Sequence, residues 1–186
     1  MAIANILTVI DTAKIITDKS SQIPDSSFES PIGLGSGETY VYMVADSRFT
    51  LSGAGEGTSE LTIKLHSEDI IRWRFAAFDN GQSLSPIVVQ FENYYTGGYA
   101  DPAEYLNPDP PGYNEDSINI YVSPSVDDLD GSPVKQPLQD RYFETKIKKA
   151  PEADVKICYQ WKFKLVDQNG LLRGYYDWDP FIIVAA

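Results

Sequence analysis

Several features that define common protein classes are scarce in this sequence. Cys158 is the only cysteine, so no disulfide can form within the chain, and a reducing cytoplasm is the expected compartment. No window approaches the run of about 18 apolar residues that a membrane span needs. The opening MAIANILTVIDTAK has no basic region ahead of its apolar run. We therefore expect neither a membrane span nor a classical export signal.

Basic residues are also in short supply. Fifteen lysines and arginines stand against 27 acidic residues, which gives a formal net charge of −12. Nucleic-acid backbones and anionic membrane surfaces both require a positive patch on the protein, so neither is an expected partner. Neutral ligands and other proteins remain. The segment from Asp101 to Asp140 holds nine acidic residues and a single basic one, Lys135, and carries most of the negative charge.

Residues for nucleophilic catalysis are nearly absent. His66 is the only histidine, and the alternation of its strand places it on the polar side, where a surface histidine is expected. Cys158 falls on the polar face of another strand, with nothing nearby in sequence to activate its thiol. The glycine-rich stretches 33–38 and 53–60 lack the G-x-G-x-x-G spacing and a G-K-S/T step, so we interpret them as turns. Without a complete catalytic set, we expect a protein that is not an enzyme.

What the chain has in abundance is short blocks of alternating apolar and polar residues. The longest is VKICYQWKFKL, 155–165, and we expect its apolar face to be buried, Trp161 included, and its polar face, Lys162 included, to be wet. Further strands are expected at 4–10, 39–45, 61–65, 70–78, 86–92, 118–122 and 181–185. Asn-Gly steps in 78–82 and 166–170 predict tight hairpin turns. About eight strands without a convincing amphipathic helix predict an all-β fold, a jelly-roll-like antiparallel β-sandwich forming one domain over 1–186.

The segment NYYTGGYADPAEYLNPDPPGYNEDS, 93–117, is rich in Tyr, Pro, Gly and Asp and is expected to be a long irregular loop. It has two interpretations: a loop packed over one end of the sandwich, or a site for a neutral carbohydrate. Tyrosine faces suit the C–H surfaces of a sugar, and carboxylates and amides suit its hydroxyls. The candidate ligand-binding residues are Tyr94, Tyr95, Tyr99, Asp101, Tyr105, Asn107, Tyr113 and Asn114.

Two acidic clusters are candidate sites. VDDLDG, 126–131, does not fit an EF-hand, because Val126 and Pro137 would stand at ligand positions one and twelve. Its acids remain candidate Ca²⁺ ligands in an irregular loop, beside the alternative of a solvated turn; they are Asp127, Asp128 and Asp130. No other cofactor is expected. Asp177 and Asp179 precede Pro180 at the mouth of a strand, which is typical of turn formers, with ligand contact and an acid pair as weaker alternatives.

Three segments together resemble a known family. The chain opens with NILTVIDT, carries EDIIRWR in its middle and closes with DQNGLLRGYYDWDPFIIV. In order and total length these resemble the bacterial inclusion-body protein family typified by PixA and AidA. The sequence departs from the family pattern at Glu68, where glycine is favoured, and at Asp177.

The resemblance implies a cytoplasmic bacterial protein with no catalytic motif to carry over. Members of the family are associated with crystalline inclusions or with quorum-sensing-controlled expression, and some look lectin-like. We therefore expect a non-enzymatic, self-associating or quorum-sensing-regulated accessory protein. A lectin-like carbohydrate-binding module that uses 93–117 is the alternative, and a glycoside hydrolase is the remote one.

Overall fold

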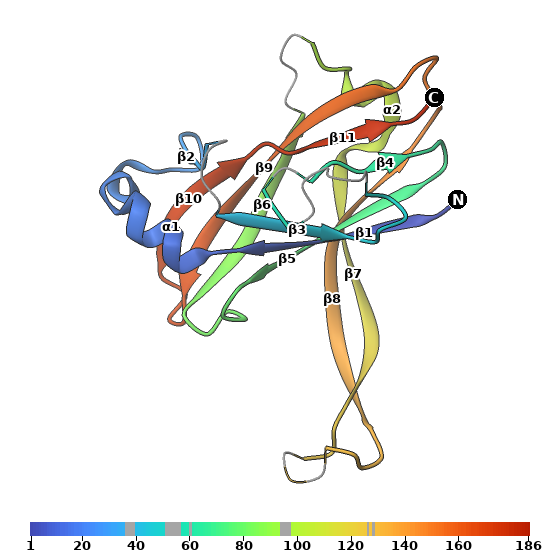
Figure 1. Cartoon of the computed structure of the whole chain (residues 1–186). Helices are drawn as coiled ribbons and strands as arrows, with labels where there is room; N and C mark the ends of the chain where they lie inside the picture. The colour runs from blue at the N-terminus through green and yellow to red at the C-terminus, as the bar shows by residue number, and fades with distance from the viewer. Residues whose placement is uncertain (36–39, 51–56, 60, 94–97, 126, 128) are drawn as a thin grey trace.

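The computed structural model describes residues 1–35, 40–50, 57–59, 61–93, 98–125, 127 and 129–186. Most of these residues lie in β-strands that form two sheets, and helices are confined to short connections (Figure 1). The all-β, sandwich-like fold expected from the alternation is confirmed. One long hairpin extends well away from the two layers.

The first sheet has the strand order β3-β1-β5-β8-β7. Its strands are β3 (Val41–Ala45), β1 (Ile3–Ile10), β5 (Ile70–Ala77), β8 (Val134–Ile147) and β7 (Leu106–Val122). Buried and exposed side chains alternate strictly along most of β1, because successive side chains point to opposite faces of a sheet. One face of this sheet therefore packs on the core, and the other is its outer face.

The second sheet has the order β2-β10-β9-β11-β4, and β6 pairs with the other side of β9. Its strands are β2 (Ile32–Gly33), β10 (Leu172–Trp178), β9 (Val155–Asp167), β11 (Phe181–Val184), β4 (Lys64–Leu65) and β6 (Leu84–Asn93). Within the described residues three pairings are parallel: β1 with β5, β2 with β10 and β4 with β11. Both sheets are thus mixed, whereas the sequence predicted antiparallel pairing throughout.

The last two strands are two halves of one return strand along β9. Trp178 lies opposite Trp161 and Phe181 lies opposite Cys158, so the register continues unchanged across the break between β10 and β11. The turn before them contains Gly170 with a φ of 75°, a value that suits glycine. The C-terminal hairpin predicted from the Asn-Gly step is confirmed.

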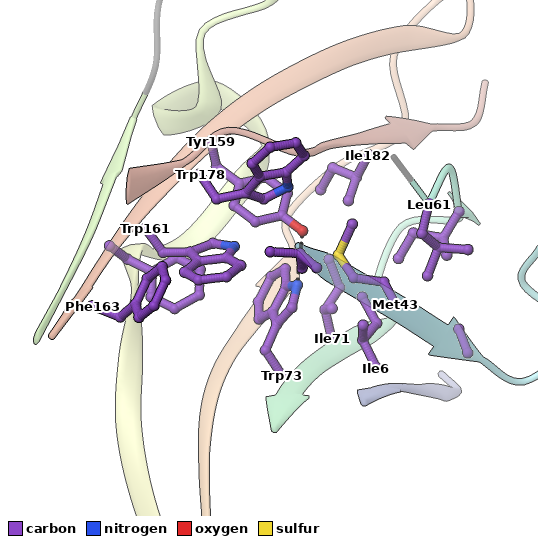
Figure 2. Close-up of a cluster of buried hydrophobic side chains, with 14 of the residues drawn as sticks. Ile6, Met43, Leu61, Ile71, Trp73, Tyr159, Trp161, Phe163, Trp178 and Ile182 are labelled. Atoms are coloured by element: carbon purple, nitrogen blue, oxygen red, sulfur yellow. Dashed lines mark hydrogen bonds between the residues drawn. The ribbon is translucent and has the colours of Figure 1, made fainter. Parts of the chain in front are cut away.

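The core lies between the sheets and is rich in aromatic rings (Figure 2). The face of β9 that was predicted to be buried is buried, with Trp161 and Phe163 fully enclosed. The Trp73 indole N–H donates a 2.8 Å hydrogen bond to the hydroxyl oxygen of Tyr159, and that of Trp178 donates to the Ser59 carbonyl at 3.0 Å. Because each of these indole N–H groups is hydrogen-bonded, its burial does not carry the free-energy cost of an unsatisfied donor.

The two residues considered as nucleophilic catalysts are placed where neither is activated. The His66 side chain is exposed, with Nδ1 3.8 Å from an Asp69 carboxylate oxygen. Cys158 lies on the outer face of β9, as expected, yet it is buried and its Sγ donates to the Pro180 carbonyl at 3.6 Å. Burial raises the pKa of this thiol to about 11, so it is protonated and inert at neutral pH.

Three expectations about local structure were wrong. Of the supposed loop 93–117, residues 106–117 belong to β7 and Pro102–Tyr105 forms α2. Asn80 and Gly81 have the expected positive φ, but their turn joins β5 to β6, which lie in different sheets. In addition, no strand was predicted over Val134–Ile147, where β8 lies.

A helix also forms where none was expected. α1 (Thr12–Lys19) follows β1 directly and continues into η1 (Ser20–Asp25). The Asp11 carboxylate accepts a 2.9 Å hydrogen bond from the Lys14 backbone N–H and so caps the helix start. Ile15 is fully buried and anchors the helix on the core.

Candidate functional site

The hairpin of β7 and β8 projects far beyond the body of the sandwich (Figure 1). We call its outer part, residues 117–139, the β-arm. Paired residues in it run from Ser117 opposite Gln139 to Val122 opposite Val134. No third strand of the described chain pairs with this part of the hairpin.

One face of the β-arm is apolar. Directly opposed residues of an antiparallel pair share a face, so Ile118 and Leu138 lie together, as do Val122 and Val134. With Ile120, which lies opposite Gln136, these four residues form what we call the apolar stripe. Leu138 is 46% exposed and Ile118 is 37% exposed, although both are large hydrophobic side chains. The stripe therefore faces solvent in the single chain.

The opposite face of the β-arm is largely polar. Its residues, in opposed pairs, are Ser117 with Gln139, Asn119 with Pro137 and Tyr121 with Lys135. Strand pairs with one apolar and one polar face usually pack the apolar face against other parts of a protein and expose the polar face to solvent. An isolated two-stranded hairpin is at best marginally stable in water, so the β-arm lacks the packing partner that strands usually need.

Ion pairs on the outer face of the first sheet fix the base of the β-arm. Arg74 on β5 donates through Nε and Nη2 to both carboxylate oxygens of Asp140 on β8, at 2.7 and 2.6 Å. Arg72 donates to Glu144 at 2.6 Å. The Arg74 hydrogen bond holds the pKa of Asp140 below its usual value, which keeps the pair charged at neutral pH. We call these residues the charged band.

Tyr142 sits between the two arginines of the charged band. Its ring centroid lies 4.6 Å from the Arg72 guanidinium carbon and 5.1 Å from that of Arg74, within cation–π range. Its hydroxyl donates to the Asp116 carboxylate at 2.5 Å, and this hydrogen bond is the main cause that raises the pKa of Tyr142. The network joins β5, β7 and β8 and sets the direction in which the β-arm leaves the body.

A cavity of about 400 Å³ opens at the base of the β-arm, on the opposite face of the hairpin. Its lining combines Phe75, Pro86, Ile87, Val88, Tyr113, Glu115, Arg141, Tyr142 and Phe143. The Tyr113 ring is 57% exposed and stands 5.5 Å from that of Phe143. Glu115 accepts a 2.8 Å hydrogen bond from Arg141. The volume lies within the range of small-molecule sites, and apolar walls with a few polar groups are typical of them.

The predicted carbohydrate-binding residues are divided among several places. Tyr94 and Tyr95 lie outside the described residues. Tyr113 lines the cavity at the arm base, whereas Tyr105 lines a separate one with Lys149, also of about 400 Å³. Tyr99 contacts Lys156, whose Nζ lies 5.5 Å from its ring centroid.

The polar members of the predicted set have structural roles or face solvent. The Asp101 carboxylate accepts from the Ala103 backbone N–H at 3.0 Å and caps α2. The Asn114 side chain donates to the Gly112 carbonyl at 3.1 Å. Asn107 is exposed. The structure thus brings no complete carbohydrate site together from the predicted residues, and only Tyr113 of the set reaches the cavity at the arm base.

The acidic residues considered as metal ligands lie at the tip of the β-arm. Asp127 and Asp130 are exposed there, and Asp128 lies outside the described residues. The Asp127 backbone N–H donates to Ser125 Oγ at 3.3 Å, as in a solvated turn. Across the part of the chain that the structure describes, no group of three or more His, Cys, Asp or Glu side chains is arranged to hold a metal ion.

The carboxyl groups before the last strand do not form an open acid pair. Asp177 is half-buried and accepts a 3.1 Å hydrogen bond from Gln160, and burial, followed by the nearby charge of Asp179, raises its pKa. Asp179 lies at the break between β10 and β11, the turn position expected for it. Neither residue lines the cavities at Tyr113 and Tyr105.

Comparison with known proteins places the chain in a family. A family model described as PixA, inclusion body protein, matches residues 2–184. The chain belongs to this family. The resemblance inferred from the three sequence motifs is thereby confirmed, and the family description names an inclusion body protein and no enzyme class.

A solved structure gives the same fold. The chain is similar to an inclusion body protein, PixA, from Burkholderia cenocepacia, at 21% identity and a TM-score of 0.64, over 100% of this chain and 95% of that one. At this identity the likeness shows the fold alone. The multicopper oxidase Fet3p, which functions in iron import, matches at 9% identity and a TM-score of 0.32, over 98% of this chain and 27% of that one, and carries no argument. No curated protein matches the chain.

The Glu68 departure from the family pattern has a backbone explanation. Glu68 has a φ of 74°, in the left-handed region that glycine enters without penalty. The residue preference at this position therefore reflects the turn before β5.

The described residues contain no helix with the length and apolar character to span a bilayer.

Proposed function

We propose that this inclusion body family protein is a non-enzymatic, cytoplasmic accessory protein that self-associates through its β-arm. The observation that carries the proposal is the apolar stripe, which leaves Leu138 46% exposed on a hairpin that projects into solvent. Covering large apolar side chains yields roughly 25 cal/mol per Å², and a paired or packed hairpin gains the support that an isolated one lacks. The family description as inclusion body proteins fits assembly of many copies.

Electrostatics sets the conditions for this assembly. Each copy carries a formal charge of −12, so copies repel one another at low ionic strength. Salt screens this repulsion, with a Debye length of about 10 Å at 0.1 M, while leaving apolar contact intact. Association through the stripe is therefore expected to strengthen as sodium chloride rises.

The test is sedimentation velocity over a range of concentrations, with two variants that add the same charge to neighbouring positions. Leu138→Asp places a carboxylate in the apolar stripe. We expect it to weaken self-association at least tenfold, because removing an unpaired charge from water has a large free-energy cost. Gln139→Asp places it on the opposite face of the same strand and should leave association close to wild type. A wild-type chain that stays monomeric at all concentrations, or equal behaviour of the two variants, would contradict the proposal.

A second function, carbohydrate binding, is favoured by the cavity at the arm base. There the exposed ring of Tyr113 stands beside the Glu115–Arg141 pair, which offers one stacking surface and groups for hydroxyls. On a glycan array, Tyr113→Ala is expected to reduce binding of a recognised neutral sugar at least tenfold. Tyr121→Ala, which removes another exposed ring, on the β-arm, should not.

The same array run with and without EDTA separates the possible roles of the acidic tip. Loss of sugar binding in EDTA would show that a divalent cation takes part, with Asp127 and Asp130 as its candidate ligands, whereas unchanged binding would leave them as a solvated turn. If the wild-type chain bound no glycan, the second function would be rejected while self-association stood unaffected.

A further inference from the structure

A second uncovered apolar surface lies on the body of the protein. On the outer faces of β1 and β3, Leu7 lies opposite Val44 and Val9 lies opposite Tyr42. Phe78, at the end of β5, contacts the Tyr42 ring edge-on at a centroid distance of 4.9 Å. We call these residues the body patch. Leu7 is 46% exposed, Val44 43% and Phe78 59%, so the patch is as open to solvent as the apolar stripe.

The body patch and the apolar stripe lie on the same face of one sheet, on either side of the charged band. Leu7 neighbours Arg74 in the parallel pairing of β1 with β5, and Arg74 is bound to Asp140 on β8. Two residues beyond Asp140 on the same face stands Leu138, the first member of the stripe. Across this face the order is therefore apolar, charged, apolar.

We propose that two copies of the chain pair so that the apolar stripe of each lies on the body patch of the other. This inference rests on the proposed self-association and names the surface that the β-arm meets. The two-fold axis of this dimer lies in the interface and runs along the charged band. A rotation of 180° about it makes the two sheets face each other and exchanges the two sides of the band. Each apolar stripe therefore lies on the body patch of the partner. The contact is isologous and buries both apolar surfaces of both copies. A pairing of stripe on stripe would leave the body patch of each chain open.

The charged band suits the position on the axis. Its arginines and carboxylates are already bound within one chain, by Arg72 with Glu144 and Arg74 with Asp140. Two such bands can therefore face each other with both ion pairs of each chain intact, which avoids the main penalty for burying their charges. The axis passes through groups that are satisfied before the copies meet.

Cysteine cross-linking between two different variants tests the pairing directly. One chain carries Leu7→Cys, the other Ile120→Cys, and they are mixed and oxidised; the native Cys158 is 3% exposed and stays out of the reaction. We expect a disulfide between the two variants at high yield. Asn119→Cys, on the polar face of the β-arm, is the control and should give at least tenfold less product with Leu7→Cys.

Sedimentation of charge variants gives an independent measure. Leu7→Asp is expected to weaken the dimer at least tenfold, as Leu138→Asp does, whereas Ile3→Asp should leave it within twofold of wild type. Ile3 lies on the same face of β1 and is also exposed, but it is four residues from Leu7 and outside the body patch. Urea unfolding checks that each variant is folded.

The outcomes separate this pairing from the proposed function. If Leu138→Asp disrupts the dimer while Leu7→Asp does not, and Ile120→Cys links to itself, self-association holds and the pairing of stripe with patch is overturned. If the wild-type chain is monomeric throughout, both fail. Loss of the dimer in both aspartate variants, together with the disulfide between positions 7 and 120, supports the pairing.

Discussion

Alanine in place of Trp73 is expected to lower the free energy of unfolding by about 4–8 kcal/mol. Removing a large buried aromatic side chain costs about 3–5 kcal/mol, because the cavity left behind closes only partly. Trp73 is 1% exposed and packs against Tyr159 at a centroid distance of 5.2 Å. Its loss also leaves the Tyr159 hydroxyl buried without its donor, a further penalty of about 1–3 kcal/mol.

Phenylalanine variants separate the hydrogen bond from the packing. Trp161 is as deeply buried as Trp73, but its indole nitrogen has no hydrogen-bond partner within the described structure. Trp73→Phe should therefore destabilise the protein by about 1–3 kcal/mol more than Trp161→Phe. Urea unfolding followed by circular dichroism measures both. Equal midpoints for the two phenylalanine variants would show that the Trp73–Tyr159 hydrogen bond adds nothing.

Alanine at Gly174 is expected to cost about 2–5 kcal/mol, from backbone strain and overpacking together. Gly174 has a φ of 114°, and a Cβ there would stand 2.8 Å from the Tyr176 hydroxyl and 3.2 Å from Ser26 Oγ. Tyr176 is fully buried, and its hydroxyl donates to the Arg173 carbonyl at 2.9 Å, so the ring cannot move aside. The close approach explains why a glycine precedes the two tyrosines of the closing motif.

Gly170 provides the matched control. It also has a positive φ, 75°, but no heavy atom lies within 4 Å of the position that a Cβ would take. Gly170→Ala should therefore show only the left-handed backbone penalty of about 1–2 kcal/mol. If thermal unfolding showed the same loss at both positions, contact with Tyr176 would not be the cause of the larger effect.

Strands were predictable from sequence where one face packs on the core. Along most of β1, β5 and β9, buried residues alternate with more accessible ones, and the sequence shows the matching apolar–polar alternation. β8 was not predicted because its outer half is exposed on both faces, so Val134–Gln139 shows no sustained alternation of apolar and polar residues. In addition, Pro137 argues against a central strand. In the β-arm that proline is tolerated because no strand of the described chain pairs with the far edge of β8.

The face of a side chain was easier to predict than its surroundings. Lys162 was expected to be wet because it alternates with buried residues on β9. It does lie on the outer face, yet its side chain is only 13% exposed, with Nζ 3.4 Å from a Glu92 oxygen and 5.2 Å from the Phe28 ring centroid. Phe28 lies more than 100 residues away in sequence, and no local pattern announces such a contact. Lys162→Ala is therefore expected to destabilise the protein, because it removes both contacts.

The candidate binding site was also hard to predict, because its neighbours in space are distant in sequence. The tyrosines of 93–117 were grouped because they are close in sequence, but β7 is extended and separates Tyr105 from Tyr113 into different cavities. The partners that Tyr113 meets at the arm base come from other strands, among them Phe75, Val88 and Arg141. The apolar stripe was not predicted for a related reason: two of its five residues, Val134 and Leu138, belong to β8, the strand that the sequence did not predict.

The parallel edges of the second sheet govern how the chain folds during synthesis. β2 pairs Ile32 with Tyr176, and β4 pairs Leu65 with Val184, so these strands from the first 65 residues can pair only after the end of the chain has been synthesised. For β4, 119 residues separate the two partners. At ribosomal rates of about 5–20 residues per second, that delay is roughly 6–24 s. Hairpins such as β7–β8 close in about 1–10 μs once both strands are available. The nascent chain therefore holds its N-terminal apolar faces uncovered for seconds, an interval in which chaperones or other nascent copies can bind them.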